Sequence, residues 1–202
     1  PFKIGLKQFV DFSLHPHWSL STLLKGIPEP KNFRYGSENK FDRNASRAGA
    51  NWEFLAELRK KWNGNLIVKG IMDTDDASRV QNAGVDAIWV SNHGGRQLDS
   101  SPPALSALPN IRNTVGPNMP IIFDSGARNG EDVVKALALG ANFVMLGRPI
   151  MMALAASSKK GLNDYLSLLK DEIGVVMAQL GINDLEKISG DVLYDGISKN
   201  IR

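Results

Sequence analysis

The sequence predicts an α/β fold built around a parallel β-sheet. Short apolar runs alternate with amphipathic stretches between residues 51 and 182. The apolar runs lack strict polar alternation, which is typical of strands that are covered on both faces. Polar and charged residues gather directly after these runs. Repeated strand–helix alternation indicates parallel strands, because each helix returns the chain to the same end of the sheet.

Each expected element follows from its own residue pattern. Helical spacing of apolar residues and suitable end residues mark helices, which are expected at 52–62, 74–82, 104–115, 130–139 and 149–180. Short apolar runs mark four strands, which are expected at 66–68, 87–90, 120–123 and 143–146. Asp73 or Thr74 is suited to cap the second helix, and Gly84 lies just past its end.

Four strand–helix units fit either an open, doubly wound sheet or part of a (β/α)8 barrel. A complete barrel needs about 250 residues, and this chain has 202. The barrel interpretation therefore expects further sequence before Pro1. The expected domains are an irregular loop at residues 1–50, the strand–helix region at 51–182 and a tail at 183–202.

The composition excludes several classes of function. The chain has no cysteine, so disulfides, zinc–thiolate sites and thiol nucleophiles are excluded. The formal net charge is +3 and no dense Lys/Arg cluster occurs, so nucleic-acid binding is not expected. No signal-peptide pattern and no apolar run long enough to span a bilayer is found. Two histidines, His15 and His17, are too few ligands to indicate a metal site.

Two of the expected strands are followed by a glycine and then an arginine. Gly126 and Arg128 follow the third strand, and Gly147 and Arg148 follow the fourth. Glycine lets backbone N–H groups approach an anion, and a helix N-terminus favours phosphate. Turn glycines with surface arginines are the plainer interpretation of either pair. The two pairs together favour a phosphate site at the carboxyl edge of the sheet.

His93 and Arg96 lie on one loop directly after the second strand. A neutral imidazole accepts a proton near neutral pH, and a guanidinium binds a carboxylate through two hydrogen bonds. An isolated histidine is more often satisfied by loop hydrogen bonds, but this pairing indicates an acidic substrate. Lys69 ends an apolar strand, so we expect it to pair with a carboxylate or to face a ligand that gains negative charge. Asp124 is expected to cap a turn or to accept hydrogen bonds from ligand hydroxyls.

These motifs resemble the FMN-dependent 2-hydroxy-acid oxidoreductases. The resemblance covers about residues 50–185, and the run SNHGGRQLD is its most specific part. The matching segments are 68–70 (VKG), 90–99 (VSNHGGRQLD), 124–128 (DSGAR), 135–141 (KALALGA) and 146–148 (LGR). The resemblance implies the C-terminal half of a (β/α)8 TIM barrel with parallel strands that carries FMN.

The resemblance also implies a role for each candidate residue. His93 corresponds to the catalytic base and Arg96 to the arginine that binds the substrate carboxylate. Lys69 corresponds to the lysine beside the N1/O2 edge of the flavin, and Ser91 is similarly placed near the ring. Asp124 resembles the partner of the ribityl hydroxyls. The implied phosphate site consists of Gly126, Arg128, Gly147 and Arg148.

The implied reaction is oxidation of a small L-2-hydroxy acid of the glycolate, lactate or mandelate class. Quinone, oxygen and a cytochrome all remain open as electron acceptors, as does the question of which proton His93 removes. The family's remaining catalytic groups are expected before Pro1, so we expect the 202 residues alone not to turn over. Two alternatives stay open: a phosphate-binding barrel isomerase or aldolase with Lys69 as Schiff-base nucleophile, and a flavin-binding module without activity.

The first 50 residues resemble the active-site loop of the membrane-associated mandelate and lactate dehydrogenases in this family. The run HPHWSL at 15–20 carries this likeness, and aromatic residues, leucines and lysines suit a membrane interface. A lid that packs on the barrel or on a neighbouring subunit is the alternative. We expect a homo-oligomer in the cytoplasm, and the membrane interpretation places it on the inner face of the cell membrane. The tail at 183–202 carries no chemical signal.

Overall fold

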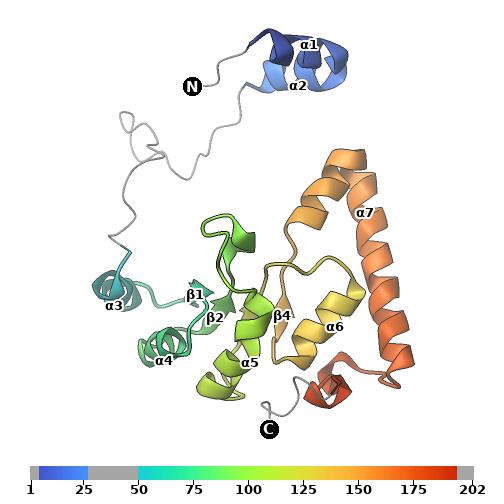
Figure 1. The fold of residues 1–202 in the computed structure, drawn as a ribbon. Helices are drawn as coiled ribbons and strands as arrows, with labels where there is room; N and C mark the ends of the chain where they lie inside the picture. Colours follow the sequence, from blue (N-terminus) through green and yellow to red (C-terminus); the bar gives the residue numbers. More distant parts are fainter. Residues whose placement is uncertain (1–4, 27–49, 195–202) are drawn as a thin grey trace. The chain divides into compact units, whose positions relative to one another are not determined.

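The computed structural model describes residues 5–26 and 50–194. The chain divides into two compact units, Pro1–Gly49 and Ala50–Arg202. The second unit contains the sheet and its helices, as Figure 1 shows. Each unit is described by itself below.

The second unit is built on a sheet of four parallel strands in the order β1-β2-β3-β4. The strands are β1 (Ile67–Ile71), β2 (Ala87–Val90), β3 (Ile121–Phe123) and β4 (Phe143–Val144). Sequential strands are therefore neighbours, as expected from strand–helix–strand units. The register between β1 and β2 shifts after Lys69. Gly70 makes this bulge possible, because its φ of +96° strains any residue with a Cβ.

The helices between the strands begin and end where side chains satisfy the free backbone groups. They are α3 (Trp52–Lys61), α4 (Thr74–Asn82), α5 (Ala104–Val115), α6 (Gly130–Ala138) and α7 (Arg148–Gln179). Asp73 caps α4 by accepting hydrogen bonds from the N–H groups of Asp75 and Asp76. The Asn129 side chain likewise accepts from the N–H of Asp132 at the start of α6. Such caps contribute roughly 1 kcal/mol each.

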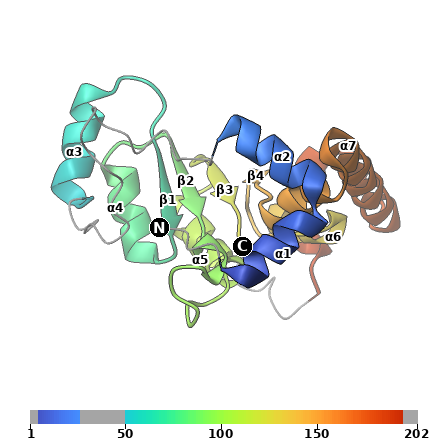
Figure 2. The ribbon, with the colours of Figure 1, turned by 90° about the horizontal axis from the view of Figure 1, so that it is seen from above.

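One face of the sheet holds the hydrophobic core. Ile88, Val90, Ile121 and Phe123 are buried there and pack together with buried residues of α4 and α5. Figure 2 shows the strands in a row with α4, α5 and α6 alongside them. Full burial of such a side chain contributes roughly 1.5–3 kcal/mol to the free energy of folding. This core therefore stabilises the sheet that carries the residues at the strand ends.

The opposite face of the sheet is only partly covered by the described residues. Lys69, Trp89, Ile122 and Phe143 are register partners across the four strands and therefore share this face. Phe143 is 59% exposed and Ile67 on the same face is 45% exposed. Apolar side chains at such exposure, on a sheet whose other face is packed, indicate a surface that another layer covers.

The first unit holds two helices, α1 (Leu6–Leu14) and α2 (Pro16–Lys25). The expectation of an irregular segment is therefore wrong for these residues. Pro16 stands at the first turn of α2, where proline is compatible with a helix. The ring centroids of Phe12 and Trp18 lie 5.4 Å apart, and the Ser19 hydroxyl donates to the carbonyl of Phe12 at 2.7 Å. Both helices are short, nine and ten residues, and Pro16 interrupts the helical periodicity between them, so they were not predicted from the sequence.

Two smaller differences concern the end of the chain. The long helix α7 is broken at Ser157 and Ser158, which have non-helical backbone angles. The segment expected to be a tail, residues 183–202, contains two short 3-10 helices, Leu185–Lys187 and Gly190–Val192. The Asp184 side chain accepts a hydrogen bond from the N–H of Glu186 at 3.0 Å and so caps the first of them. Expectations for residues 1–4, 27–49 and 195–202 lie outside the described residues.

Candidate functional site

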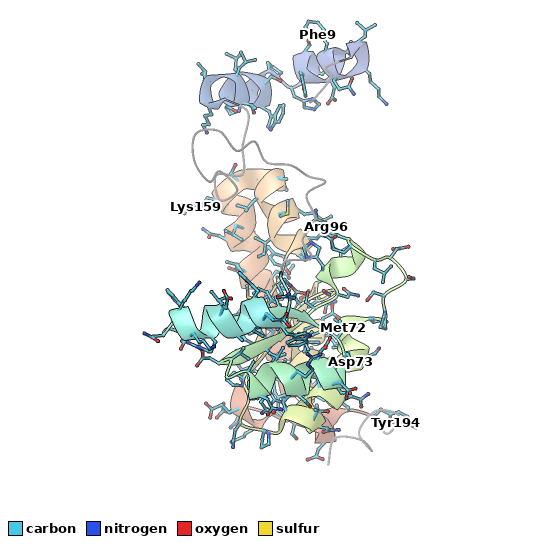
Figure 3. The ribbon with its side chains drawn as sticks, turned by 90° about the vertical axis from the view of Figure 1, so that its left-hand side faces the viewer. Phe9, Met72, Asp73, Arg96, Lys159 and Tyr194 are labelled. Carbon is cyan, nitrogen blue, oxygen red and sulfur yellow. The ribbon has the colours of Figure 1, made fainter. Side chains whose placement is uncertain are left out.

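The candidate site is a cavity at the carboxyl ends of the four strands. Its volume is about 340 Å³. Its walls come from Lys69 of β1, Trp89 of β2, the turns that follow β2, β3 and β4, and the start of α7. Figure 3 shows Arg96 on the loop after β2, at the end of this unit opposite Tyr194. Every site residue expected from the sequence lines the cavity except Ser91, which is 2% exposed and lies behind it.

Lys69 and Asp124 form an ion pair at one wall of the cavity. The Nζ of Lys69 lies 2.5 Å from Asp124 Oδ2 and donates to the hydroxyl of Ser91 at 2.7 Å. The same Nζ lies 4.2 Å from the centroid of the Trp89 ring, which adds a cation–π contact. The ammonium is therefore held beside the cavity by three contacts.

The Asp124 carboxylate is the centre of a hydrogen-bond network. Burial raises its pKa, but hydrogen bonds from Lys69, Ser91 and Ser125 outweigh burial and hold the pKa below its ordinary value. Ser91 donates to Asp124 Oδ1, and Ser125 donates to the same oxygen at 2.7 Å. Asp124 is thus a charged acceptor at neutral pH, and it joins the ends of β1, β2 and β3.

The loop that carries His93 has an unusual backbone. His93, Gly94 and Gly95 have φ values of +57°, +68° and +73°. Glycine adopts this left-handed region without cost, whereas histidine does so at a cost of roughly 1–3 kcal/mol. Side chains hold the loop in place: Ser91 Oγ accepts from the His93 N–H at 3.1 Å, and Asn92 Oδ1 accepts from the Gly94 N–H at 2.9 Å. Such local strain is typical of functional sites.

Four basic side chains around the cavity have free polar groups. Among residues 5–26 and 50–194, the side chains of His93, Arg96, Arg128 and Arg148 make no hydrogen bond or ion pair. The Arg148 guanidinium reaches from the start of α7 to the loop after β2, where its Nη2 lies 3.4 Å from the Cβ position of Gly94. The loop after β2 and the turn after β4 therefore border the same space.

Two helices begin at the cavity, and only one of them has a free N-terminus. At α6, Glu172 accepts from the Gly130 N–H at 2.8 Å, and Asp132 accepts from the Arg128 N–H at 2.9 Å. At α7, the N-cap residue Gly147 has no side-chain cap and the first turn has no acidic residue. The free N–H groups and dipole of α7 therefore favour an anion.

The space at the two cavity glycines fits such an anion. A Cβ placed on Gly126 or Gly147 would meet no described atom within 4 Å. From the sequence, the turns after β3 and β4 were predicted to contribute equally to the phosphate site. The structure favours the second turn, because carboxylates already hold amides around the start of α6. Arg128 still lines the cavity and adds positive charge.

Sequence reasoning assigned no role to three residues that shape the site. Ser125 and Asn92 hold the His93 loop through the Gly94 N–H, and Trp89 lies against Lys69. Ser125 and Asn92 stand inside the motifs that the sequence singled out, so their positions were visible while their hydrogen bonds were not. Trp89 could have been singled out because its indole N–H is the polar group in an otherwise apolar strand.

Comparison with known proteins gives a consistent result. The model of a family described as FMN-dependent dehydrogenase matches residues 1–195. An (S)-mandelate dehydrogenase of Pseudomonas putida is 38% identical over 201 residues, covering 96% of this chain and 51% of the relative. An L-lactate dehydrogenase of Acinetobacter baumannii is 37% identical over 206 residues, covering 98% of this chain and 54% of the relative. The chain spans about half the length of these curated relatives.

Solved structures resemble the chain to a similar extent. A crystal structure described as the monotopic membrane protein (S)-mandelate dehydrogenase has a TM-score of 0.86 at 37% identity, covering 96% of this chain and 53% of that one. A mandelate oxidase has a TM-score of 0.65 at 40% identity, covering 68% of this chain and 40% of that one. The expectation of half a (β/α)8 barrel with parallel strands is confirmed.

Proposed function

The chain belongs to the FMN-dependent dehydrogenase family, and from this premise we propose that the cavity at the strand ends binds FMN. We propose further that the protein oxidises a small L-2-hydroxy acid to the corresponding 2-oxo acid. One observation carries the proposal. Two free basic side chains of a single loop, His93 and Arg96, line the same cavity as the uncapped N-terminus of α7.

The residues present suit FMN from its phosphate to its ring. The first-turn N–H groups of α7 and the guanidinium of Arg148 would hold the phosphate. Arg128 adds a second guanidinium. The turns at Gly126 and Gly147 leave space for the phosphate. Asp124 accepts hydrogen bonds, as ribityl hydroxyls require. Lys69 would lie beside the ring and offer positive charge where reduction places negative charge, and the buried Ser91 would hold the Lys69 ammonium from behind.

Each of the chain's own residues then has a separate task toward the substrate. When bound, FMN supplies a two-electron acceptor. Arg96 binds the substrate carboxylate through two charge-assisted hydrogen bonds and so orients the hydroxyl-bearing carbon. His93 accepts a proton from the substrate at that carbon or at its hydroxyl oxygen. The Lys69 ammonium, fixed by Asp124 at 2.5 Å, stabilises the charge that develops.

Anaerobic reduction of the bound flavin tests the proposed reaction. The intact FMN-loaded protein is mixed with L-lactate, L-mandelate or glycolate, and the visible absorption of the flavin is followed. We expect bleaching by at least one of the three acids. We expect His93→Gln to retain the flavin and to bleach at least about a hundredfold more slowly, as for loss of a general base. Flavin that none of these acids reduces would instead support a binding module without this activity.

The aldolase or isomerase alternative is less well supported. Its Schiff-base step needs a lysine with a neutral, accessible amine. The Lys69 Nζ is engaged by Asp124, by Ser91 and by the face of Trp89. That alternative also gives no role to the His93 imidazole and the Arg96 guanidinium. Borohydride trapping of a carbonyl substrate on Lys69 would favour it over the flavin reaction.

We propose in addition that α1 and α2 bind a membrane surface. No helix among the described residues is long and apolar enough to cross a bilayer. Large apolar side chains of both helices are nevertheless exposed to 50–85%: Leu6, Phe9, Val10, Leu14, Trp18, Leu20, Leu23 and Leu24. Such residues with lysines nearby are typical of helices that lie in the interface. Among the possible electron acceptors, a membrane surface favours a quinone over oxygen or a cytochrome.

Flotation with liposomes that contain anionic lipid tests the membrane proposal. We expect the intact protein to float with the vesicles, and the double variant Leu23→Ser, Leu24→Ser to float less. Leu185→Ser is the matched control, because Leu185 is 53% exposed but belongs to the second unit. Equal flotation of both variants would favour a lid or subunit contact instead.

A further inference from the structure

Ser125 has a backbone conformation that glycine would adopt more easily. Its φ is +85°, and only two other non-glycine residues among those described, His93 and Ser158, have positive φ. The next residue, Gly126, also has positive φ, at +118°. Left-handed conformation is unfavourable for any residue with a Cβ. A serine here therefore needs a compensating role for its hydroxyl.

The Ser125 hydroxyl joins two loops of the site. Its oxygen accepts from the Gly94 N–H at 3.1 Å, and its proton is donated to Asp124 Oδ1 at 2.7 Å. Ser91 Oγ lies 3.4 Å away. Gly94 follows His93 directly, whereas Asp124 pairs with Lys69. The Ser125 hydroxyl thus connects the loop that carries His93 with the ion pair of Lys69 and Asp124.

We propose that Ser125 is a positioning residue for His93. Through Gly94 it fixes the loop after β2, and through Asp124 it sets that loop in register with the Lys69 ammonium. This inference rests on the proposed function, in which His93 accepts a proton from the substrate and Lys69 stabilises the charge that develops. The Gly94 N–H is shared with Asn92 at 2.9 Å, so loss of Ser125 loosens the loop but does not release it.

Glycine at position 125 separates this role from a purely structural one. Ser125→Gly removes the hydroxyl and relieves the backbone, whereas Ser125→Ala removes the hydroxyl and keeps the strain. We therefore expect Ser125→Gly to be at least as stable as Ser125→Ala. A structural role alone predicts that the glycine variant works as well as the wild type. A positioning role predicts that both variants lose function.

The experiment measures two properties of the intact protein. In the FMN-free protein, amide hydrogen exchange at Gly94 is followed; in the FMN-loaded protein, kcat/KM for the best 2-hydroxy acid is measured against pH. We expect Ser125→Gly to exchange faster at Gly94 and to lose about three- to tenfold in kcat/KM, the effect of losing the neutral hydrogen bond from the Gly94 N–H. We also expect a shift in the limb of the pH profile that reports His93.

The matched control is Ser158→Gly. Ser158 also has positive φ, at +47°, but it stands at the break of α7 and does not line the cavity. It should leave Gly94 exchange and kcat/KM at wild-type values. Wild-type exchange, kcat/KM and pH profile in Ser125→Gly would overturn the role of Ser125. Absence of flavin reduction in the wild type would overturn the proposed function instead, and exchange at Gly94 would still report on the loop.

Discussion

The Asp124 carboxylate is the negative charge at the wall of the cavity, and three side chains donate hydrogen bonds to it. It accepts from Lys69, Ser91 and Ser125, and its pKa lies below the ordinary value although burial acts to raise it. A carboxylate with a lowered pKa in the folded state stabilises the protein at pH values above the ordinary pKa of 3.8. That contribution is lost as the pH falls through the folded-state pKa.

Asp124→Asn should therefore change how stability depends on pH. Above about pH 5 the variant should be less stable than the wild type, because Lys69 loses its charged partner. Towards pH 3 the difference should shrink, because the wild-type carboxylate becomes protonated. Urea denaturation at pH 7 and at several pH values below 3.8 measures this difference. A difference that stays constant with pH would contradict the assigned ion pair.

Arg96→Lys should impair substrate binding selectively. Lysine keeps the charge but lacks the fork that binds a carboxylate through two hydrogen bonds. We expect KM for the 2-hydroxy acid to rise by about tenfold or more, while affinity for FMN stays unchanged. Steady-state kinetics and flavin titration measure the two effects. Equal losses in both would place Arg96 at the flavin instead.

At the level of single residues, the sequence predicted positions better than contacts. His93, Arg96 and Lys69 were singled out because ionisable residues next to apolar strands are conspicuous, and all three line the cavity. The sequence left open whether Lys69 pairs with a carboxylate, and the structure supplies Asp124, 55 residues away. Ser125 was missed because its strain and its hydrogen bond to Gly94 depend on how two loops meet, which no local pattern encodes.

Among the elements, the N-termini of α6 and α7 differ in what occupies them. Glu172 and Asp132 accept hydrogen bonds from N–H groups at and before the start of α6, whereas α7 begins at Arg148 without a side-chain cap. Both helices follow a glycine–arginine turn, so the sequence could not separate them. Glu172 comes from α7, and its contact with Gly130 spans 42 residues. Only the packing of α6 against α7 reveals this difference.

Arg148→Ala should weaken the binding of FMN but not of riboflavin, which lacks the phosphate. We expect an FMN affinity about tenfold or more lower, because one charge-assisted contact to the phosphate is lost. Glu172→Gln is the matched control: it should lower stability by about 1 kcal/mol and leave the FMN-to-riboflavin ratio unchanged. An unchanged ratio in Arg148→Ala would move the phosphate away from α7.

Most helices and strands were predictable because local signals agree with the final fold. Asp73 and Asn129 cap helices that begin at the expected residues, and β2 has the bounds that its apolar run predicted. The strand β4 is only two residues long, shorter than its apolar run. Helices α1 and α2 were not predicted because they are short and Pro16 interrupts the helical periodicity between them.

For the second unit as a whole, the partly covered face of the sheet is the dominant feature. Ile67 and Phe143 are exposed on it, and the buried Trp89 Nε1 has no hydrogen-bond partner among the described residues. Buried polar groups are normally satisfied. Since the chain covers about half of its relatives, we propose that the other half of the barrel covers this face.

Complementation tests that proposal. The 202 residues alone should not oxidise 2-hydroxy acids, whereas co-expression with the N-terminal half of the P. putida (S)-mandelate dehydrogenase should restore flavin-dependent turnover. Phe143→Asp should abolish the restoration, because it places a charge on the face to be covered. Efficient turnover by the 202 residues alone would contradict the proposal.

A crystal structure of the intact protein with FMN and the 2-oxo acid product examines the whole arrangement at once. We predict the phosphate at the first-turn N–H groups of α7 beside Arg148, the ring beside Lys69, and the product carboxylate on Arg96 within reach of His93. A phosphate bound elsewhere, or side chains of His93 and Arg96 turned away from the ring, would contradict the assignment of this cavity.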